Sequence, residues 1–268
     1  MKPTRLGKLL LALLWLALGS PAHTDKIDLE SDQNIRKLLA EMRDPLVNKA
    51  ELSKLFQIGD KQINDLVSAL EDSDRQISLR AQIVIRYLGS EAGMSELIEW
   101  YGKQQQFSMS GPIPSPLRKW DYKVIKMNYL NQPAGSWVSV ERYIYALAID
   151  GSSEASVTLA QIAEMVRVMD EGAVAKRAVQ LVKTANAGAA LGSNKDLANL
   201  VLKNAFFILT EDRKNASAQL LAFSHTRDKA LVEVRVNRGS FSEEWYHVVM
   251  RKQGSEWYFL SITPLAIS

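Results

Sequence analysis

The chain offers few of the side chains from which catalytic or metal sites are usually built. It has three histidines, His23, His225 and His247, and no cysteine. No histidines show the spacing of a metal-binding motif, and no GxSxG motif occurs. His247 alternates with Trp245 and Val249 in a strand-like segment, so packing within a sheet is a simpler interpretation than a role in a site. The sequence predicts no catalytic residue, no metal site and no cofactor, and it favours a protein that is not an enzyme.

A segment near the middle of the chain, residues 103–136, combines positive charge with large aromatic side chains. It carries five basic residues and one acidic residue, so its net charge is 5 − 1 = +4. Aromatic and arginine side chains often anchor interfaces, and long loops often bind partners. Trp120 and Val124 lie at helical spacing, so packing in the core of an irregular repeat is the alternative. The residues that we predict to contact a partner are Trp100, Phe107, Arg118, Lys119, Trp120, Tyr122 and Lys123.

Residues 1–22 have the order of an export signal. Three basic residues lie within the first eight, an apolar run occupies 9–18, and small residues follow up to Ala22. The run is short for a membrane span of roughly 20 residues. We therefore predict a signal peptide cleaved after Ala22, with an uncleaved membrane anchor as the alternative. Residues 23–34 are polar and are expected to form a disordered lead-in, and the protein is expected to be periplasmic or extracellular.

Export changes what the charge of the protein implies. Residues 1–22 hold three basic residues and no acidic residue, so the remaining chain has 33 − 3 = 30 basic and 30 acidic residues. A neutral chain gives no indication of a nucleic-acid or anionic-membrane partner. If residues 103–136 bind a partner, an acidic protein or an anionic envelope component such as a glycan is expected. No later apolar run is long enough to cross a bilayer.

Helical hairpins are the elements expected to position these side chains. Within residues 63–89, apolar residues recur at spacings of three and four in two segments joined by an acidic turn. Asp74 is expected to cap the second helix and Gly89 to end it. One hairpin cannot bury both of its apolar stripes, so similar hairpins must stack beside it. We predict a right-handed stack of antiparallel helix hairpins, an α-solenoid, over residues 35–187, with an irregular insert at 104–136.

The C-terminal part, residues 194–268, has a different period. One helical segment follows a small-residue linker at 187–193, and four segments of period two follow that helix. Val232, Val234 and Val236 are expected on one sheet face, and the residues between them on the other. Short turns favour antiparallel neighbours, so we predict a helix and a four-stranded antiparallel meander. The predicted strands are 217–224, 230–237, 244–251 and 257–263.

Two resemblances add to this interpretation. The hairpin at 63–89 resembles a HEAT repeat, and the looser likeness over 33–187 departs from that pattern at 104–136. The matching positions are Leu66, Leu70, Asp72, Asp74, Ile77, Arg80, Ala81, Ile85, Leu88 and Gly89. This resemblance implies a scaffold that presents a surface to a partner and brings no shared catalytic residues. Residues 195–268 are more distantly similar to NTF2-like or cystatin-like modules.

The two resemblances imply two different functions. The first is an exported protein that binds a partner through a helical-repeat surface without catalysis. The second is a ligand-binding protein or enzyme with a pocket in the C-terminal module or between that module and the helices. The residues to examine first in such a pocket are Tyr246, His247, Trp257 and Tyr258.

Overall fold

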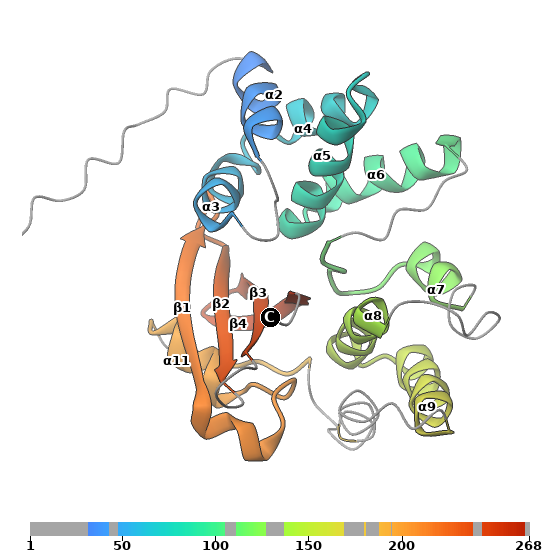
Figure 1. Ribbon diagram of the computed structural model, residues 1–268, viewed down its shortest axis with the longest axis vertical. Coiled ribbons are helices and arrows are strands. Elements are labelled where there is room, and N and C mark those ends of the chain that lie inside the picture. Colours follow the sequence, from blue (N-terminus) through green and yellow to red (C-terminus); the bar gives the residue numbers. More distant parts are fainter. Residues whose placement is uncertain are drawn as a thin grey trace, which may run out of the picture.

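Helices come first along this chain, and an antiparallel sheet ends it (Figure 1). This is a computed structural model. It describes residues 32–42, 48–104, 111–126, 137–168, 180, 188–193, 195–237 and 243–265. The predicted order of helices followed by a four-stranded antiparallel sheet is confirmed. The predicted signal peptide at 1–22 and most of the predicted lead-in lie outside the described residues, although α2 already begins at Asp32.

The N-terminal helices form the upper part of the molecule in Figure 1. In α5 the side chain of Asp74 accepts a hydrogen bond from the Gln76 amide at 2.8 Å. Gly89 ends the helix with a left-handed backbone, φ +55°, and its amide donates to the Ile85 carbonyl. Both predicted boundaries of this helix are therefore confirmed. The elements are α2 (Asp32–Glu41), α3 (Lys49–Ile58), α4 (Ile63–Ser68), the 3₁₀ turn η1 (Ala69–Glu71), α5 (Arg75–Leu88) and α6 (Glu91–Gln104).

The next helices include part of the predicted insert. Residues 111–115 of that insert are buried, and α7, which follows them, buries Tyr122, Val124 and Ile125. Residues 111–115 and the buried side of α7 therefore pack into the body of the protein. The elements are α7 (Lys119–Ile125), α8 (Trp137–Asp150), α9 (Ser153–Val168), α11 (Leu197–Lys203) and the 3₁₀ segment η3 (Thr210–Asn215).

The sheet is a meander in which each strand pairs with the next along the chain. Its order is β1-β2-β3-β4, and all three pairings are antiparallel. The register shifts between Leu220 and Ala222 of β1 and between Val249 and Met250 of β3. The strands are β1 (Ala216–Phe223), β2 (Lys229–Asn237), β3 (Glu243–Gln253) and β4 (Glu256–Leu265).

Both faces of this sheet are covered by helices. Val232, Val234 and Val236 face the α8–α11 core, which also contains buried residues of α7, α8, α9 and α11. Leu231 and Val249 face the α3–α5 core, which contains buried residues of α2 to α6. The predicted alternation along β2 is thus confirmed, and each core combines residues of the sheet with residues of the preceding helices.

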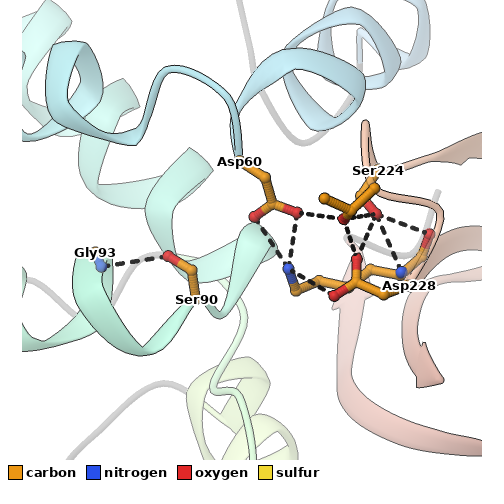
Figure 2. A network of polar contacts seen from close by, with 7 residues as sticks. Asp60, Ser90, Gly93, Ser224 and Asp228 are labelled. Atoms are coloured by element: carbon orange, nitrogen blue, oxygen red, sulfur yellow. Dashed lines mark hydrogen bonds and ion pairs between the residues drawn. The ribbon is translucent and has the colours of Figure 1, made fainter. Parts of the chain in front are cut away.

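A polar cluster joins the loop after α3 to the β1–β2 turn (Figure 2). Lys229 Nζ lies 2.8 and 3.0 Å from the two carboxylate oxygens of Asp60. Ser224 donates to Asp228 Oδ1 at 2.9 Å and accepts from the Lys229 amide at 3.1 Å. The side chains of Lys229 and Asp60 are only 12% and 11% exposed, so water screens this ion pair little. The pair ties the helical part to the sheet.

Replacing Lys229 with Met should lower the free energy of unfolding by about 2 kcal/mol, because the nearly buried side chain of Asp60 would lose the cation that contacts it. Urea unfolding at pH 7 measures the change. Lys37→Met is the matched control, since Lys37 is 72% exposed and its partner Glu41 is 3.8 Å away. That change should stay within about 0.5 kcal/mol. Equal effects of the two substitutions would contradict a stabilising role for the Lys229 ion pair.

Candidate functional site

The predicted partner-binding residues lie on and beside α6 and α7, except for Phe107, which is outside the described residues. Trp100 of α6 and Trp120 of α7 both contact the ring of Tyr101, with centroid distances of 5.4 and 6.0 Å. The structure therefore brings the two tryptophans together around a buried tyrosine. Trp120 also packs against both the α8–α11 core and the α3–α5 core.

The remaining predicted residues divide into structural and exposed groups. Tyr122 is buried, and its hydroxyl donates to Asp150 Oδ1 at 3.1 Å. Burial raises the pKa of Tyr122 to about 12, so the hydroxyl stays protonated. Arg118 is half-buried where α7 begins, whereas Lys119 and Lys123 are exposed. The accessible part of the predicted surface is therefore these two lysines beside Trp120. We name this group the α7 surface.

A second site that combines polar groups lies on the sheet face that meets α3 and α5. Glu233 of β2 is opposite His247 of β3, and His247 is opposite Thr263 of β4. We name these three residues the polar row. Their exposed fractions are 1%, 0% and 0%. Side chains directly opposite each other on antiparallel strands have Cβ atoms about 5 Å apart, so the row forms one continuous polar strip inside the protein.

His247 is held by the helix above it. The hydroxyl of Tyr87, from α5, forms a 2.8 Å hydrogen bond with His247 Nδ1. The two rings meet edge to face with their centroids 5.8 Å apart. Burial lowers the pKa of His247 to about 4, with the charge of Lys49 acting in the same direction and that of Glu233 opposing it. The imidazole is therefore neutral at pH 7.

Glu233 is held in its ionised form by two cations. Lys49 Nζ, from α3, and Arg235 Nε each lie 2.7 Å from Glu233 Oε1. Burial by itself would raise the pKa of Glu233, but the hydrogen bonds from both cations outweigh it and lower the pKa. Lys49 and Arg235 also lie over the ring of Trp245, at 5.0 and 4.4 Å from its centroid. These three residues are half-exposed and lie beside the buried row.

Several polar atoms along the row have no hydrogen-bond partner among the described residues. They are Glu233 Oε2, His247 Nε2, Thr263 Oγ1 and the neighbouring Ser261 Oγ. The ionised carboxylate can only accept hydrogen bonds, whereas the neutral imidazole and the two hydroxyls add donors to the set. Such a set suits a small polar ligand, and the imidazole could exchange a proton with it. In the described part of the chain, no group of three or more His, Cys, Asp or Glu side chains is placed to hold a metal.

The residues first named for a C-terminal pocket do not converge. Tyr246 and Trp257 belong to the α8–α11 core, on the sheet face opposite His247. Tyr246 donates a hydrogen bond to Glu244 at 2.7 Å, and Glu244 is only 4% exposed. The adjacent residue Glu243 is half-exposed. Tyr258 is half-buried. Only His247 of the four belongs to the polar row.

Sequence reasoning missed Tyr87, Lys49, Glu233 and Thr263 as site residues. Glu233 was expected only on the sheet face opposite the valines, and nothing nearby in the sequence indicates that helices cover that face. One usable signal lies in α5, where the apolar run at 83–85 covers more than one side of the helix. A helix that is apolar on several sides is expected to be buried on several sides. That pattern indicates that other elements pack against α5 on more than one side.

No family model matches the chain, and searches of curated proteins and of solved structures found no match. The resemblances to HEAT repeats and to NTF2-like or cystatin-like modules therefore remain predictions. Among the helices that the structure describes, none combines the length and the apolar character needed to span a bilayer.

Stability should fall with acid because of His247. The pKa of His247 is about 4 in the folded protein and ordinarily 6.5, so between these values the unfolded chain binds the proton and the folded chain does not. Stability is therefore complete above about pH 6.5 and is lost as the pH falls toward 4. The loss should be about 2 kcal/mol between pH 7 and pH 5. Urea unfolding at the two pH values measures it.

His247→Gln keeps a polar side chain beside Tyr87 but cannot titrate, so it should remove most of that pH dependence. His225→Gln is the control, because His225 is exposed in the β1–β2 turn. Comparing the wild type with each variant separates the contribution of His247 from that of Glu233, whose pKa is lowered. A wild-type slope that persists in His247→Gln would disprove the assignment.

Proposed function

We propose that this chain is an exported, non-catalytic interaction protein in which helical hairpins form a HEAT-like scaffold. The α7 surface would bind an acidic protein or an anionic envelope component. The observation that carries the proposal is the placement of Lys119 and Lys123 on a helix whose Trp120 packs against both cores. A rigid surface loses less conformational entropy on binding than a mobile one. Two exposed lysines on one helix, beside a half-buried tryptophan, suit an anionic partner.

Contacts between the first helices support the hairpin scaffold. Arg36 Nε of α2 lies 2.7 Å from Asp72 Oδ2 in the turn before α5. Arg80 of α5 donates to the carbonyls of Leu39 and Ala40, at the end of α2, at 2.7 and 3.0 Å. These bonds join α2 to the next hairpin through Asp72 and Arg80, two positions of the repeat-like pattern. Stacked repeats need such contacts between neighbours.

Charge reversal on α7 tests the proposed surface. Lys119→Glu combined with Lys123→Glu should weaken partner binding at least about tenfold, because two attractive contacts become repulsive. The partner is first captured from the native envelope by chemical cross-linking. Its affinity for the purified variants is then measured by isothermal titration calorimetry.

The control is Lys37→Glu combined with Lys54→Glu, which changes the net charge equally at exposed positions of α2 and α3. We expect it to leave binding unchanged at physiological salt, where exposed charges beyond about 8 Å are largely screened. Equal losses in both double variants would indicate a general charge effect and would reject the α7 surface. Unchanged binding in the α7 variant would reject it as well.

A second candidate function is the binding of a small polar ligand along the polar row. The buried, unpartnered atoms of Glu233, His247 and Thr263 favour it. A buried polar atom without a partner costs about 1–3 kcal/mol of stability, which a ligand with matching groups would recover. Native mass spectrometry of protein purified from its own envelope tests this function. A retained small molecule that is lost in Thr263→Val would support it.

In the ligand-free protein, Thr263→Val should raise the free energy of unfolding by about 1 kcal/mol. Valine has nearly the shape of threonine and lacks the hydroxyl that finds no partner. Thr158→Val is the matched control, because Thr158 is equally buried and its hydroxyl donates to the Glu154 carbonyl at 2.8 Å. The control should be neutral or destabilising. Urea denaturation distinguishes the two, and a destabilised Thr263→Val protein would show that this hydroxyl is satisfied in solution.

A further inference from the structure

The two edges of the sheet are treated differently by the rest of the chain. The outer edge of β4 is bonded to other segments: the Leu191 amide donates to the Trp257 carbonyl at 2.8 Å, and the Trp257 amide donates to the Gly192 carbonyl at 3.1 Å. The Ser115 amide donates to the Leu260 carbonyl at 2.7 Å. Across the outer edge of β1, no backbone hydrogen bond is made within the described part of the chain. Among the segments that the structure describes, β1 is therefore the open edge, and it is the outermost strand in Figure 1.

The composition of β1 suits pairing with another strand. Its eight residues are ASAQLLAF, without a charged residue or a proline. Natural proteins commonly place charged residues or proline on an open edge to prevent pairing, and β1 lacks both. Ala216 and Ala218 pack against the α8–α11 core, and Leu220 follows them in register on the same face. Ser217 and Gln219 lie on the other face. Leu220 is 36% exposed. Among the large hydrophobic residues of the described segments, only Leu220 and Val157 are exposed.

We propose that β1 is a self-association edge, on which a second copy of this chain pairs antiparallel around a two-fold axis to form one sheet of eight strands. Two-fold symmetry places β1 opposite itself, and an uncharged strand meets its copy without repulsion. The apolar side of the strand, with Ala218 and Leu220, would then continue onto the same side of the copy. The register shift after Leu220 bends the strand, so pairing is centred on residues 216–220.

The backbone bonds across the outer edge of β4, at Trp257 and Leu260, explain why the second copy completes the assembly. A chain with two open edges would continue to add copies and would form a fibre. Here each chain offers one open edge, so pairing through β1 uses both open edges and stops at two. A closed dimer therefore fits this sheet better than an extended array. The inference is independent of the α7 surface and of the polar row.

Sedimentation velocity of the purified full chain over a range of concentrations tests the inference. The wild-type protein should form a dimer that dissociates on dilution. Leu220→Lys should raise the dimer dissociation constant at least tenfold, because it places two like charges near the symmetry axis. Val157→Lys is the matched control, since Val157 is 60% exposed on α9, and it should dimerise as the wild type does. A wild-type protein that stays monomeric at every concentration would overturn the proposal.

Disulfide cross-linking locates the interface, and the absence of native cysteine makes it unambiguous. Single variants Ser217→Cys, Ala218→Cys and Gln219→Cys place a thiol at or next to the expected axis. At least one of them should form a covalent dimer under mild oxidation, faster than Val157→Cys. Circular dichroism of each variant verifies that it is folded. A dimer that cross-links no faster through β1 than through Val157 would also overturn the proposal.

Discussion

The charge of Glu233, buried on a sheet face, is the constraint on which the arrangement of the two parts depends. An ionised carboxylate with 1% exposure is tolerated only where cations and hydrogen bonds replace water. Arg235 supplies one cation from the same strand, but the other, Lys49, comes from a helix 184 residues earlier. Glu233 therefore has both of its cations only when α3 is docked on the sheet. The Tyr87–His247 hydrogen bond likewise forms only when α5 is docked on the sheet, and it joins residues 160 positions apart.

This constraint changes how the helical part should be understood. In an α-solenoid each repeat contacts its neighbours, and the terminal repeats need a cap to cover their outer apolar face. α5 contacts α2 and α4, and it reaches the sheet through the Tyr87–His247 hydrogen bond and a shared core, so nearly all of its residues from Ile77 to Leu88 are buried. The sheet thus covers part of α5 that would otherwise face water. The Asp60–Lys229 ion pair adds a second connection at the β1–β2 turn (Figure 2).

Local chemistry explains which features could be predicted from the sequence. Asp74 and Gly89 define the ends of α5 because capping depends on a few neighbouring residues. The meander followed from short turns and period-two alternation, which are also local. The burial of Glu233 and Glu244 could not be predicted in this way, because alternation assigns residues to two faces but does not show whether both are covered. Tyr122 was expected to contact a partner, yet its hydroxyl bonds Asp150, 28 residues later.

The polar row is difficult to explain by stability alone. The same sheet face accepts Leu231 and Val249, both fully buried, so apolar side chains fit it well. A valine in place of Thr263 would preserve shape and remove a hydroxyl that has no partner among the described residues. The geometry of the strands therefore does not require the polar side chains that lie opposite one another on β2, β3 and β4. The row places an ionised carboxylate, a neutral imidazole and a hydroxyl side by side. Contact with a polar molecule would give this arrangement a physical reason. On this buried sheet face, the polar groups that could bind a ligand are the same groups whose unpartnered atoms lower the stability of the fold.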